Sequence, residues 1–311
     1  MNKYKPAFVD CYGDLADRFN DKLACTVPGL EVFYDKPASD DELIQRLQGR
    51  KNVMVYMGYM SSKVLNSCPD LKTISYLSTG LTTHGDLKES SKLGIRFEGV
   101  KGYGDRAVAE HTIALAFAAI KRITEMDRTI RSGNWKLIKT EELQGKTFGV
   151  IGLGGIGLET AKIANSLGMR ALCWSRSSSK LDLPVETASL DQVLKQSDII
   201  SLHLPLNSET EGFINHELLS KTKPGLILIN TARAEIIDQQ ALISALSSGH
   251  IGHCALDVFH EEPLAKDNDL LLMKNITVTP HSAWLTTQAI DRLILAGLNL
   301  LNKHILETQN D

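Results

Sequence analysis

The sequence predicts an α/β protein built on a doubly wound parallel sheet, with a second, smaller α/β domain. Three observations support this fold class. Six short apolar runs in the second half of the chain begin 22 to 28 residues apart, which is the spacing of a strand plus a crossover helix. A glycine-rich turn follows the first of these runs. The first hundred residues repeat the same alternation more loosely, and a length of 311 residues fits about two domains.

The six apolar runs of the second half are predicted strands separated by helices. The strands are Thr147–Ile151, Ala171–Trp174, Asp198–Leu202, Leu226–Asn230, Cys254–Val258 and Ile276–Thr279. An unbroken apolar run such as Leu226–Ile229 is typical of a strand buried on both faces. Helices are predicted at Thr160–Leu167, Leu190–Gln196 and Gln239–Ser248. Asp238 is suited to cap the last of these, and Gly249 to end it.

The first part of the chain predicts a smaller α/β domain. Its candidate strands are Ala7–Tyr12, Glu31–Tyr34, Val53–Met57, Thr73–Leu77 and Ile95–Phe97, and its candidate helices are Asp40–Gln48 and Ser61–Asn66. One long, alanine-rich helix is predicted from Arg106 to Thr129, and a last amphipathic helix from Thr286 to Leu306. No Pro-, Gly- or Ser-rich linker separates the halves, so the boundary is drawn where the pattern changes.

Charge and composition support no large polyanionic partner. With 34 Lys and Arg against 37 Asp and Glu, the formal charge of −3 gives no electrostatic reason to expect nucleic acid or an anionic membrane. The first residues lack a signal-peptide pattern, and the apolar stretch Thr112–Ile120 is far shorter than the roughly 20 residues of a membrane span. Five cysteines without a C-x-x-C pair predict neither disulfides nor a zinc site. We therefore expect a cytoplasmic protein without a metal.

The glycine-rich turn predicts a dinucleotide site. Gly152, Gly154 and Gly157 form G-x-G-x-x-G between a strand and a helix, which is the Rossmann-type arrangement. Gly152 allows the tight turn, Gly154 the close approach of a pyrophosphate, and Gly157 close contact between helix and strand. Gly155 and Ile156 begin the helix, where backbone N–H groups face the phosphate charge.

The end of the next strand indicates which dinucleotide is preferred. An NAD-selective site usually has an acidic residue there, whereas this chain has Ser175 followed by Arg176. Arg binds a 2′-phosphate in bidentate fashion and Ser donates a hydrogen bond to it. The sequence therefore predicts that NADP is preferred over NAD, unless Arg176 is simply a solvated side chain of a polar loop.

Three ionisable side chains follow later strands. Arg233 comes after one strand, Glu262 follows the next, and His281 follows the last. Open α/β sheets bind ligands at the carboxyl ends of their strands, so these residues are predicted to converge on one crevice. Each of them alone is common in proteins, but their combination with the glycine loop points to chemistry.

With these segments in place, the chain resembles the D-isomer-specific 2-hydroxyacid dehydrogenases, a group that includes glyoxylate/hydroxypyruvate reductases and D-3-phosphoglycerate dehydrogenases. Besides the glycine loop, the matching segments are Val108-Ala109-Glu110, Gly133-Asn134-Trp135, Leu143-Gln144-Gly145-Lys146-Thr147, His203-Leu204-Pro205-Leu206, Ala255-Leu256-Asp257-Val258-Phe259, Glu262-Pro263 and Thr279-Pro280-His281. The resemblance implies a Rossmann-type cofactor domain over residues 100–282. It also implies a flavodoxin-like substrate domain over 1–99 and 283–311, and a homodimer formed mainly through 106–135.

The resemblance also implies roles for the three ionisable residues. Arg233 matches the arginine that binds the substrate carboxylate, and its planar fork suits that group. His281 matches the acid/base that protonates the carbonyl oxygen as hydride arrives at carbon. Glu262 matches the carboxylate that pairs with His281 and favours its protonated form. We choose Glu262 over Glu261 because it directly precedes Pro263, as in the family pattern.

Further contacts are implied by the same resemblance. Backbone N–H groups of Thr79 and Gly80 are expected to hold the substrate carboxylate, although Ser78-Thr79-Gly80 also reads as a simple turn, and Met57–Met60 is expected to line the cleft. Thr231, Ala232 and Asp257 are expected near the nicotinamide, where Arg233 and His281 also contact the cofactor. His203 and Pro205 match a loop on the adenosine side, where a purely structural role is equally compatible with the sequence.

Some departures from the family pattern narrow the substrate. Ala234 stands where the family usually has Gly, which restricts the local backbone. The loop Ser78-Thr79-Gly80 has no Lys for a second anionic group, and the chain ends soon after its last helix. An amino-acid-regulated phosphoglycerate dehydrogenase is therefore disfavoured, and a small 2-oxo acid such as glyoxylate or hydroxypyruvate, or a bulkier analogue, is expected.

Two alternatives remain open. One is a cofactor-sensing interaction protein of the same fold, and the other is a phosphite-type dehydrogenase. A formate dehydrogenase is disfavoured because those enzymes lack the Glu that pairs with His.

Overall fold

A computed structural model describes residues 5–176 and 185–309 of the chain. The chain divides into two compact units. The small unit comprises Met1–Gly104 and Thr286–Asp311, and the large unit comprises Asp105–Leu285. The sequence placed the crossings a few residues earlier, at 99/100 and 282/283. In the structure they coincide with the starts of helix α5 at Asp105 and helix α12 at Thr287.

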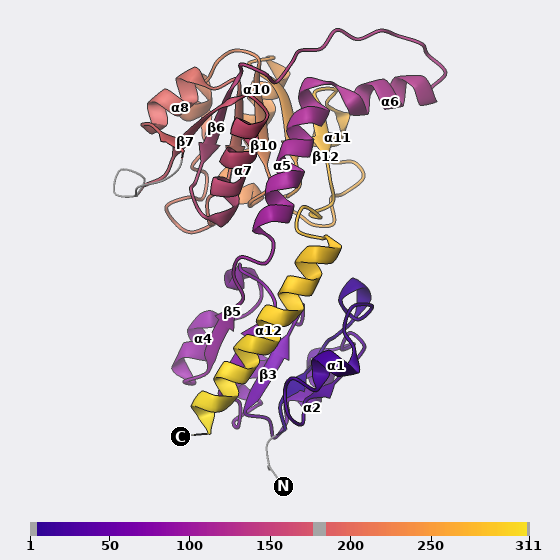
Figure 1. Ribbon diagram of the computed structural model, residues 1–311, viewed down its shortest axis with the longest axis vertical. Coiled ribbons are helices and arrows are strands. Elements are labelled where there is room, and N and C mark those ends of the chain that lie inside the picture. Colours follow the sequence, from indigo (N-terminus) through magenta and orange to yellow (C-terminus); the bar gives the residue numbers. More distant parts are fainter. Residues whose placement is uncertain (1–4, 177–184, 310–311) are drawn as a thin grey trace. The chain divides into compact units, whose positions relative to one another are not determined.

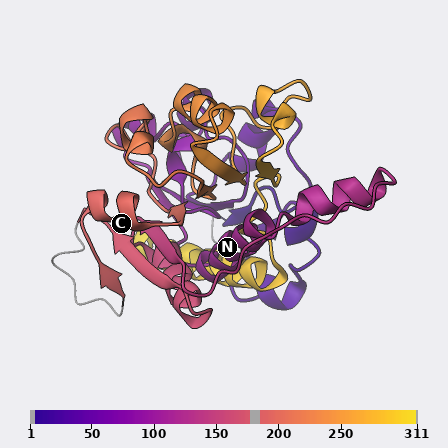
Figure 2. The ribbon, with the colours of Figure 1, turned by 90° about the horizontal axis from the view of Figure 1, so that it is seen from above.

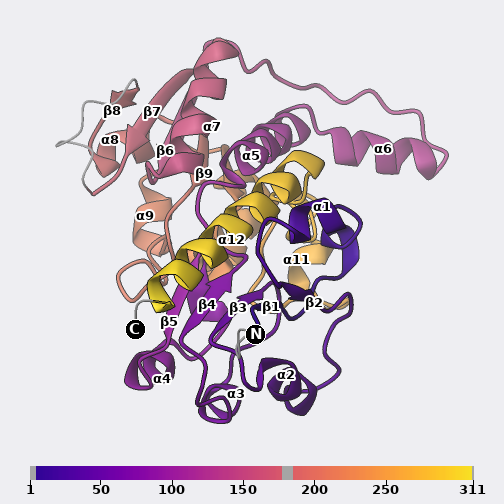
Figure 3. The same cartoon turned by 60° about the horizontal axis from the view of Figure 1, so that its bottom comes forward.

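The small unit contains a five-stranded parallel sheet in the order β2-β1-β3-β4-β5. The strands are β1 (Ala7–Phe8), β2 (Glu31–Val32), β3 (Asn52–Val55), β4 (Thr73–Tyr76) and β5 (Arg96–Gly99). Its α-helices are α1 (Asp21–Ala24), α2 (Asp40–Leu47), α3 (Ser62–Asn66), α4 (Leu87–Lys92) and α12 (Thr287–Thr308). Figure 3 shows α12 and α1 on one face of the sheet and α2, α3 and α4 on the other. This strand order is the flavodoxin-like one, and its direction of winding reverses between β1 and β3.

The large unit contains a seven-stranded parallel sheet in the order β12-β11-β10-β9-β6-β7-β8. The strands are β6 (Thr147–Ile151), β7 (Arg170–Trp174), β8 (Glu186–Thr187), β9 (Ile199–Leu202), β10 (Leu226–Asn230), β11 (Ile251–Leu256) and β12 (Ile276–Val278). The α-helices are α5 (Asp105–Ile120), α6 (Ile123–Arg131), α7 (Gly155–Ser166), α8 (Leu190–Gln196), α9 (His216–Ser220), α10 (Gln239–Ser247) and α11 (Asp269–Leu272). This is the Rossmann order with its reversal between β6 and β9.

Two apolar cores cover the two faces of the large sheet. One core forms where α5 and α7 pack on the sheet, and it includes Ala116, Phe148 and Ala161. The other forms under α8, α9 and α10, and it includes Val193, Leu219 and Leu242. Figure 1 shows α5 and α7 in front of the strands and α10 behind them. The α/β class with two parallel sheets, predicted from the sequence, is therefore confirmed.

Most predicted elements are present, with shifts at their ends. The residue ranges of β6, β10 and α8 agree with the prediction, and Asp238 caps α10 by accepting a hydrogen bond from the backbone N–H of Ala241. Strand β11 begins three residues earlier than predicted, at Ile251, and includes Gly252. The short edge strand β8 was not predicted, since two exposed residues give no apolar signal.

The single long helix predicted from Arg106 to Thr129 is wrong. Helix α5 ends at Ile120, Arg122 adopts a left-handed conformation with φ of 50°, and α6 starts at Ile123. A left-handed residue cannot continue a right-handed helix, so the chain changes direction there. No Gly or Pro marks the break in the sequence. Helix α6 and the segment that returns from it project from the rest of the large unit (Figures 1 and 2).

Across the described residues, no helix combines the length and apolarity that crossing a membrane requires.

Candidate active site

The strand order of the large sheet brings the predicted site residues to one edge. Since all strands are parallel, the segments after β12, β11, β10, β9, β6 and β7 leave the sheet at the same side. In that order they carry His281, Glu262, Arg233, His203, the glycine loop and Arg176. Neighbouring strands lie about 4.8 Å apart, so β12 and β10 differ by about 10 Å at this edge.

The glycine loop lies at the reversal of the large sheet, between β6 and β9. Gly152 has φ of 104°, and a Cβ added to it would lie 2.4 Å from the carbonyl oxygen of His203. A Cβ on Gly157 would lie 1.9 Å from the carbonyl oxygen of Gly152. Both positions therefore require Gly, because the loop packs directly on the backbone.

Gly154 is different, and it shows where a ligand fits. It caps α7, and a Cβ added to it would meet nothing within 4 Å. The open space lies at the N-terminus of a twelve-residue helix, where unpaired N–H groups attract phosphate. The residues present therefore fit the pyrophosphate of a dinucleotide.

The Arg233 segment is held by a buried amide. Asn230 is fully buried at the end of β10. Its Oδ1 accepts a hydrogen bond from the backbone N–H of Ala232 at 3.0 Å, and its Nδ2 donates one to the carbonyl of Arg233 at 2.8 Å. The half-buried Arg233 follows in extended conformation, with φ of −146°. Ala234 does not have a positive φ, so the Ala at this position introduces no strain.

His281 and Glu262 are directly bonded. The distance from His281 Nδ1 to Glu262 Oε2 is 2.7 Å, and Glu262 Oε1 accepts a hydrogen bond from the backbone N–H of Phe259 at 2.9 Å. His281 has φ of 50°, a conformation that is strained for a residue with a side chain. Both residues line a hollow of about 620 Å³, together with Phe259, Pro263 and Pro280.

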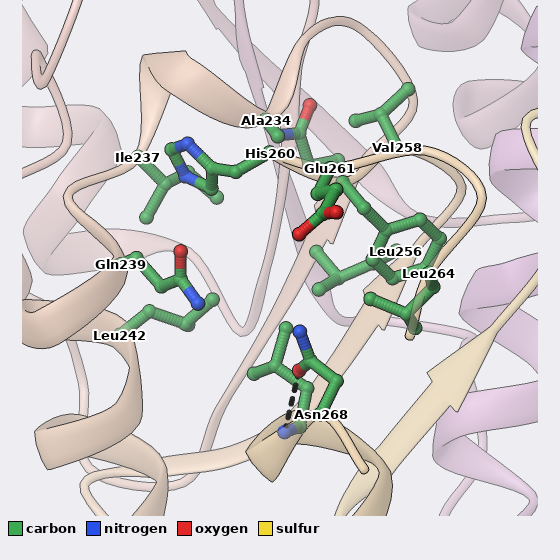
Figure 4. Close-up of a pocket in the computed structure, with 13 residues that line it drawn as sticks. Ala234, Ile237, Gln239, Leu242, Leu256, Val258, His260, Glu261, Leu264 and Asn268 are labelled. Atoms are coloured by element: carbon green, nitrogen blue, oxygen red, sulfur yellow. Dashed lines mark hydrogen bonds between the residues drawn. The ribbon is translucent and has the colours of Figure 1, made fainter. Parts of the chain in front are cut away.

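Glu261, the competing carboxylate in the sequence, lines a different cavity. That cavity of about 150 Å³ has Leu242 and Leu256 in its wall and His260 beside Glu261. Figure 4 shows the Glu261 carboxylate pointing into it. The two neighbouring glutamates therefore line different cavities, and Glu262 is the one in contact with His281.

A buried network that the sequence did not reveal fixes the segment around His281. Asp257 is fully buried, and it accepts hydrogen bonds from the backbone N–H groups of Ser282 at 3.0 Å and Ala283 at 2.9 Å. It also accepts one from the Thr279 hydroxyl at 2.5 Å. His111 Nε2 lies 3.0 Å from the same hydroxyl oxygen, and since that hydroxyl donates to Asp257, His111 acts as the donor. The partners of Asp257 thus bracket His281 on both sides.

Comparisons with known proteins decide the family. A model of the D-isomer specific 2-hydroxyacid dehydrogenase NAD binding domain matches residues 113–283. A glyoxylate reductase of Thermofilum pendens is 38% identical over 279 residues, which are 86% of this chain and 82% of that protein. The chain belongs to the D-isomer-specific 2-hydroxyacid dehydrogenase family.

Solved structures agree over almost the whole chain. An acyclic imino acid reductase in complex with NADPH and D-Arg has a TM-score of 0.83 at 29% identity, covering 97% of both chains. A D-lactate dehydrogenase from Aquifex aeolicus, complexed with NAD and lactic acid, has a TM-score of 0.80 at 28% identity, covering 98% of this chain and 97% of that one. The protein is thus an NAD(P)-dependent 2-hydroxyacid dehydrogenase, and small 2-oxo and 2-hydroxy acids are typical substrates of its family.

Ser175 and Arg176, the predicted adenosine-side residues, directly follow β7. Arg176 forms an ion pair with Glu209, and both side chains are largely exposed. Sequence reasoning missed Glu209 because nothing in the sequence links the two positions. A 2′-phosphate would have to replace this carboxylate as the partner of Arg176.

His203, Pro205 and Thr231 also make local contacts. His203 Nε2 bonds with the Ser201 hydroxyl at 2.9 Å, and the carbonyl of Pro205 accepts a hydrogen bond from Thr210. His203 keeps some exposed surface, but the protein excludes water from most of its ring, and this desolvation lowers its pKa to about 3. The Thr231 hydroxyl bonds with that of Thr112 at 3.0 Å.

Thr79 and Gly80 lie in the small unit, in the loop after β4. The Thr79 hydroxyl donates to the carbonyl of Val100 at 3.1 Å, and Gly80 precedes a short 3-10 helix at Leu81–Thr83. Among the described residues, no group of three His, Cys, Asp or Glu side chains is arranged to hold a metal ion.

Proposed function

We propose that this dehydrogenase reduces a small 2-oxo acid, such as glyoxylate or hydroxypyruvate, to the 2-hydroxy acid, with the D configuration where the product is chiral. The observation that carries the proposal is the bond between His281 Nδ1 and Glu262. Because Nδ1 faces the carboxylate, Nε2 is the nitrogen left to face a substrate, and none of the described residues bonds to it. The similarity to a glyoxylate reductase supports the choice of substrate.

Each of the three ionisable residues has one task in the proposed reaction. Arg233 binds the substrate carboxylate with its guanidinium, and the Asn230 contacts hold the backbone from which its side chain extends. His281 donates the Nε2 proton to the carbonyl oxygen, and Glu262 compensates the positive charge of the imidazolium before that transfer. The nicotinamide, when bound, supplies the hydride. In the oxidation direction His281 takes the proton back.

The remaining site residues have supporting roles in this proposal. Thr79 and Gly80 hold the substrate carboxylate through their backbone N–H groups. Gly152, Gly154, Gly155, Ile156 and Gly157 receive the pyrophosphate, His203 and Pro205 lie beside the adenosine, and Thr231, Ala232 and Asp257 lie beside the nicotinamide. The small unit is then the substrate domain and the large unit the dinucleotide-binding domain.

NADPH is the proposed preferred cofactor. Support comes from Arg176 after β7 and from the absence of an acidic residue at Ser175. Steady-state kinetics with NADPH and NADH measure the preference directly, and equal or better catalytic efficiency with NADH contradicts it.

A homodimer is the proposed assembly. Helix α6 and the segment after it expose large apolar side chains, with exposed fractions of 58% for Ile130, 87% for Trp135 and 89% for Leu137. Such a projecting apolar arm is expected to be covered by a second copy of the chain. Light scattering coupled to size-exclusion chromatography tests this, with Trp135→Ser/Leu137→Ser as the variant expected to be monomeric. The cytoplasmic location stays a prediction, which cell fractionation tests.

The decisive experiment for the reaction is a panel of 2-oxo acids with NADPH or NADH, followed by nicotinamide absorbance. Turnover of glyoxylate or hydroxypyruvate, with a D-configured product from hydroxypyruvate, is the expected result. Cofactor binding without turnover of any 2-oxo acid favours the sensing alternative, and reduction of NADP or NAD by phosphite favours the phosphite alternative.

A further inference from the structure

A fully buried carboxylate in the small unit has no part in the reaction proposed above. Asp10, which follows β1, has no exposed surface. Its Oδ1 accepts a hydrogen bond from the backbone N–H of Tyr56 at 2.7 Å, and its Oδ2 accepts those of Met57 at 2.8 Å and Gly58 at 2.7 Å. Three successive backbone N–H groups directed at one point form a cradle for an anion. Here the anion is part of the chain itself.

The cradle lies where the winding of the small sheet reverses. Strands β1 and β3 are neighbours in the sheet (Figure 3), and the chain leaves β1 and β3 for opposite faces. Such a reversal opens a crevice at the carboxyl ends of the strands, which in other sheets holds a ligand. In this unit the carboxylate of Asp10 lies at that end of the strands, and the turn after β3 is built around its charge.

Contacts continue from this turn to the predicted substrate loop. The Tyr76 hydroxyl donates to the carbonyl of Gly58 at 3.2 Å, and the Tyr76 ring stacks on His84 with centroids 4.7 Å apart. His84 Nε2 bonds with the Ser78 hydroxyl at 3.0 Å. Ser78 directly precedes Thr79 and Gly80. A displacement of the turn at Gly58 would therefore shift the loop at Ser78, Thr79 and Gly80 through packed and hydrogen-bonded side chains.

We propose that Asp10 is a positioning residue for substrate binding: its negative charge holds the Tyr56–Gly58 turn and, through Tyr76 and His84, the Ser78–Gly80 loop in the conformation that receives the substrate carboxylate. This inference rests on the proposed function, because that function gives the loop its ligand. Asp10 itself does not contact the substrate.

Protonation of Asp10 would remove this charge. Burial raises the pKa of Asp10 to about 6, while the three backbone N–H groups and Arg46 act in the opposite direction. Among the described residues, the titratable and charged groups that interact electrostatically with Asp10 are Cys11, Tyr12, Tyr56, Tyr76 and Arg46. Burial raises the pKa of the thiol and of the three phenols, so these groups remain neutral near pH 6 while Arg46 remains charged. Asp10 is therefore the group in this set that changes charge near pH 6.

The kinetic test compares the wild type with Asp10→Asn at saturating NADPH, using glyoxylate between pH 5 and 7.5. If only the ionised form holds the loop, the wild-type KM rises about tenfold from pH 7.5 to pH 5, because roughly one molecule in ten remains ionised. Asp10→Asn is expected to show the high KM at both pH values, with kcat and NADPH affinity within about twofold of wild type. Any pH dependence that remains in this variant reports other groups of the protein.

Asp17→Asn is the matched control, because Asp17 is an exposed carboxylate of the same unit. It is expected to keep the wild-type KM profile. The proposal is overturned if Asp10→Asn and wild type share one KM profile, or if the variant loses kcat while its KM stays unchanged.

Hydrogen exchange gives a second readout that needs neither a variant nor activity. In the wild type, the amides of Tyr56, Met57 and Gly58 are expected to be protected at pH 7.5. At pH 5 they should lose protection after correction for intrinsic exchange rates. Unchanged protection at pH 5 overturns the proposal even if Asp10→Asn does not fold. If no 2-oxo acid is turned over, the proposed function fails while this exchange result still tests the role of Asp10.

Discussion

The bond between His281 and Glu262 predicts a specific pattern of energetic coupling. Glu262→Gln preserves the shape of the side chain but replaces a charge-assisted hydrogen bond of 2.7 Å by a neutral one. Hydrogen bonds to charged groups contribute about 1.5–3 kcal/mol. The side chains of His281 and Glu262 are 39% and 35% exposed, so solvent screens the interaction and the lower value applies. A loss of about 1.5 kcal/mol corresponds to about a tenfold decrease in kcat/KM.

A double-mutant cycle measures this coupling. His281→Ala removes the proton donor and is expected to lower kcat by roughly 10²- to 10⁴-fold, while NADPH still binds. In the His281→Ala background, Glu262→Gln should have almost no further effect, because the charge it compensates is gone. The assay is nicotinamide absorbance with a 2-oxo acid at saturating NADPH, and NADPH affinity is measured separately by fluorescence.

Glu261→Gln is the matched control for this cycle. Glu261 is the neighbouring residue with the same side chain, but it lines the separate cavity of Figure 4. Its substitution should leave kcat/KM within about twofold of wild type. Equal losses for Glu261→Gln and Glu262→Gln, or additive losses in the cycle, would refute the assignment of Glu262 as the partner of His281.

Three further predictions concern the cofactor domain. Gly157→Ala places a Cβ 1.9 Å from the Gly152 carbonyl oxygen and should destabilise the protein by about 1–3 kcal/mol in thermal unfolding. Gly154→Ala should fold normally, because its Cβ meets nothing within 4 Å, and should lose NADPH affinity in a fluorescence titration. Arg176→Ala should lower kcat/KM for NADPH by about tenfold or more and leave kcat/KM for NADH unchanged, while Glu209→Gln should raise kcat/KM for NADPH relative to NADH. If neither variant changes the ratio of the two kcat/KM values, Arg176 does not contact a 2′-phosphate. Burial lowers the pKa of His203 from 6.5 to about 3 in the folded protein. As the pH falls below about 6.5, His203 is therefore protonated in the unfolded chain but not in the folded protein, and the free energy of unfolding decreases. Denaturant unfolding at pH 7 and pH 5 should show a loss of about 2 kcal/mol from this group that is absent in His203→Gln.

The sequence predicted those parts of the structure that depend on local pattern. Strands β6 and β10 have the expected bounds because they are continuous apolar runs, and the glycine loop was recognisable because Gly152 and Gly157 have no steric alternative. The break at Arg122 was missed because neither a Gly nor a Pro marks its left-handed conformation in the sequence. The local sequence pattern therefore predicted these strands but not the break between α5 and α6.

The limits of prediction at the site have a similar cause. Glu262 could be chosen over Glu261 only from the resemblance, since the two are adjacent and chemically identical. The contacts of Asp257 with Thr279, and of Thr279 with His111, join residues far apart in the chain, and no spacing rule connects them. The sequence did not mark Asp10 as a functional residue either, because a single acidic residue after an apolar run is an ordinary sequence feature.

Asp10 and Asp257 share one structural solution, and their different neighbours predict different kinetic effects. Each is a fully buried carboxylate after a parallel strand, and each accepts backbone N–H groups from the segment that follows an adjacent strand. An Asn side chain would turn a donor toward one of those N–H groups and leave it unsatisfied, at a cost of about 1–3 kcal/mol.

Because the partners of Asp257 bracket His281, Asp257→Asn should lower kcat by about tenfold or more by misplacing the acid. Asp10→Asn should instead raise KM, because its turn is coupled to the substrate loop. Steady-state kinetics of the two variants at pH 7.5 separate the effects. A common decrease in kcat for both variants would mean that each acts only through general destabilisation, and that the two carboxylates do not position separate parts of the site.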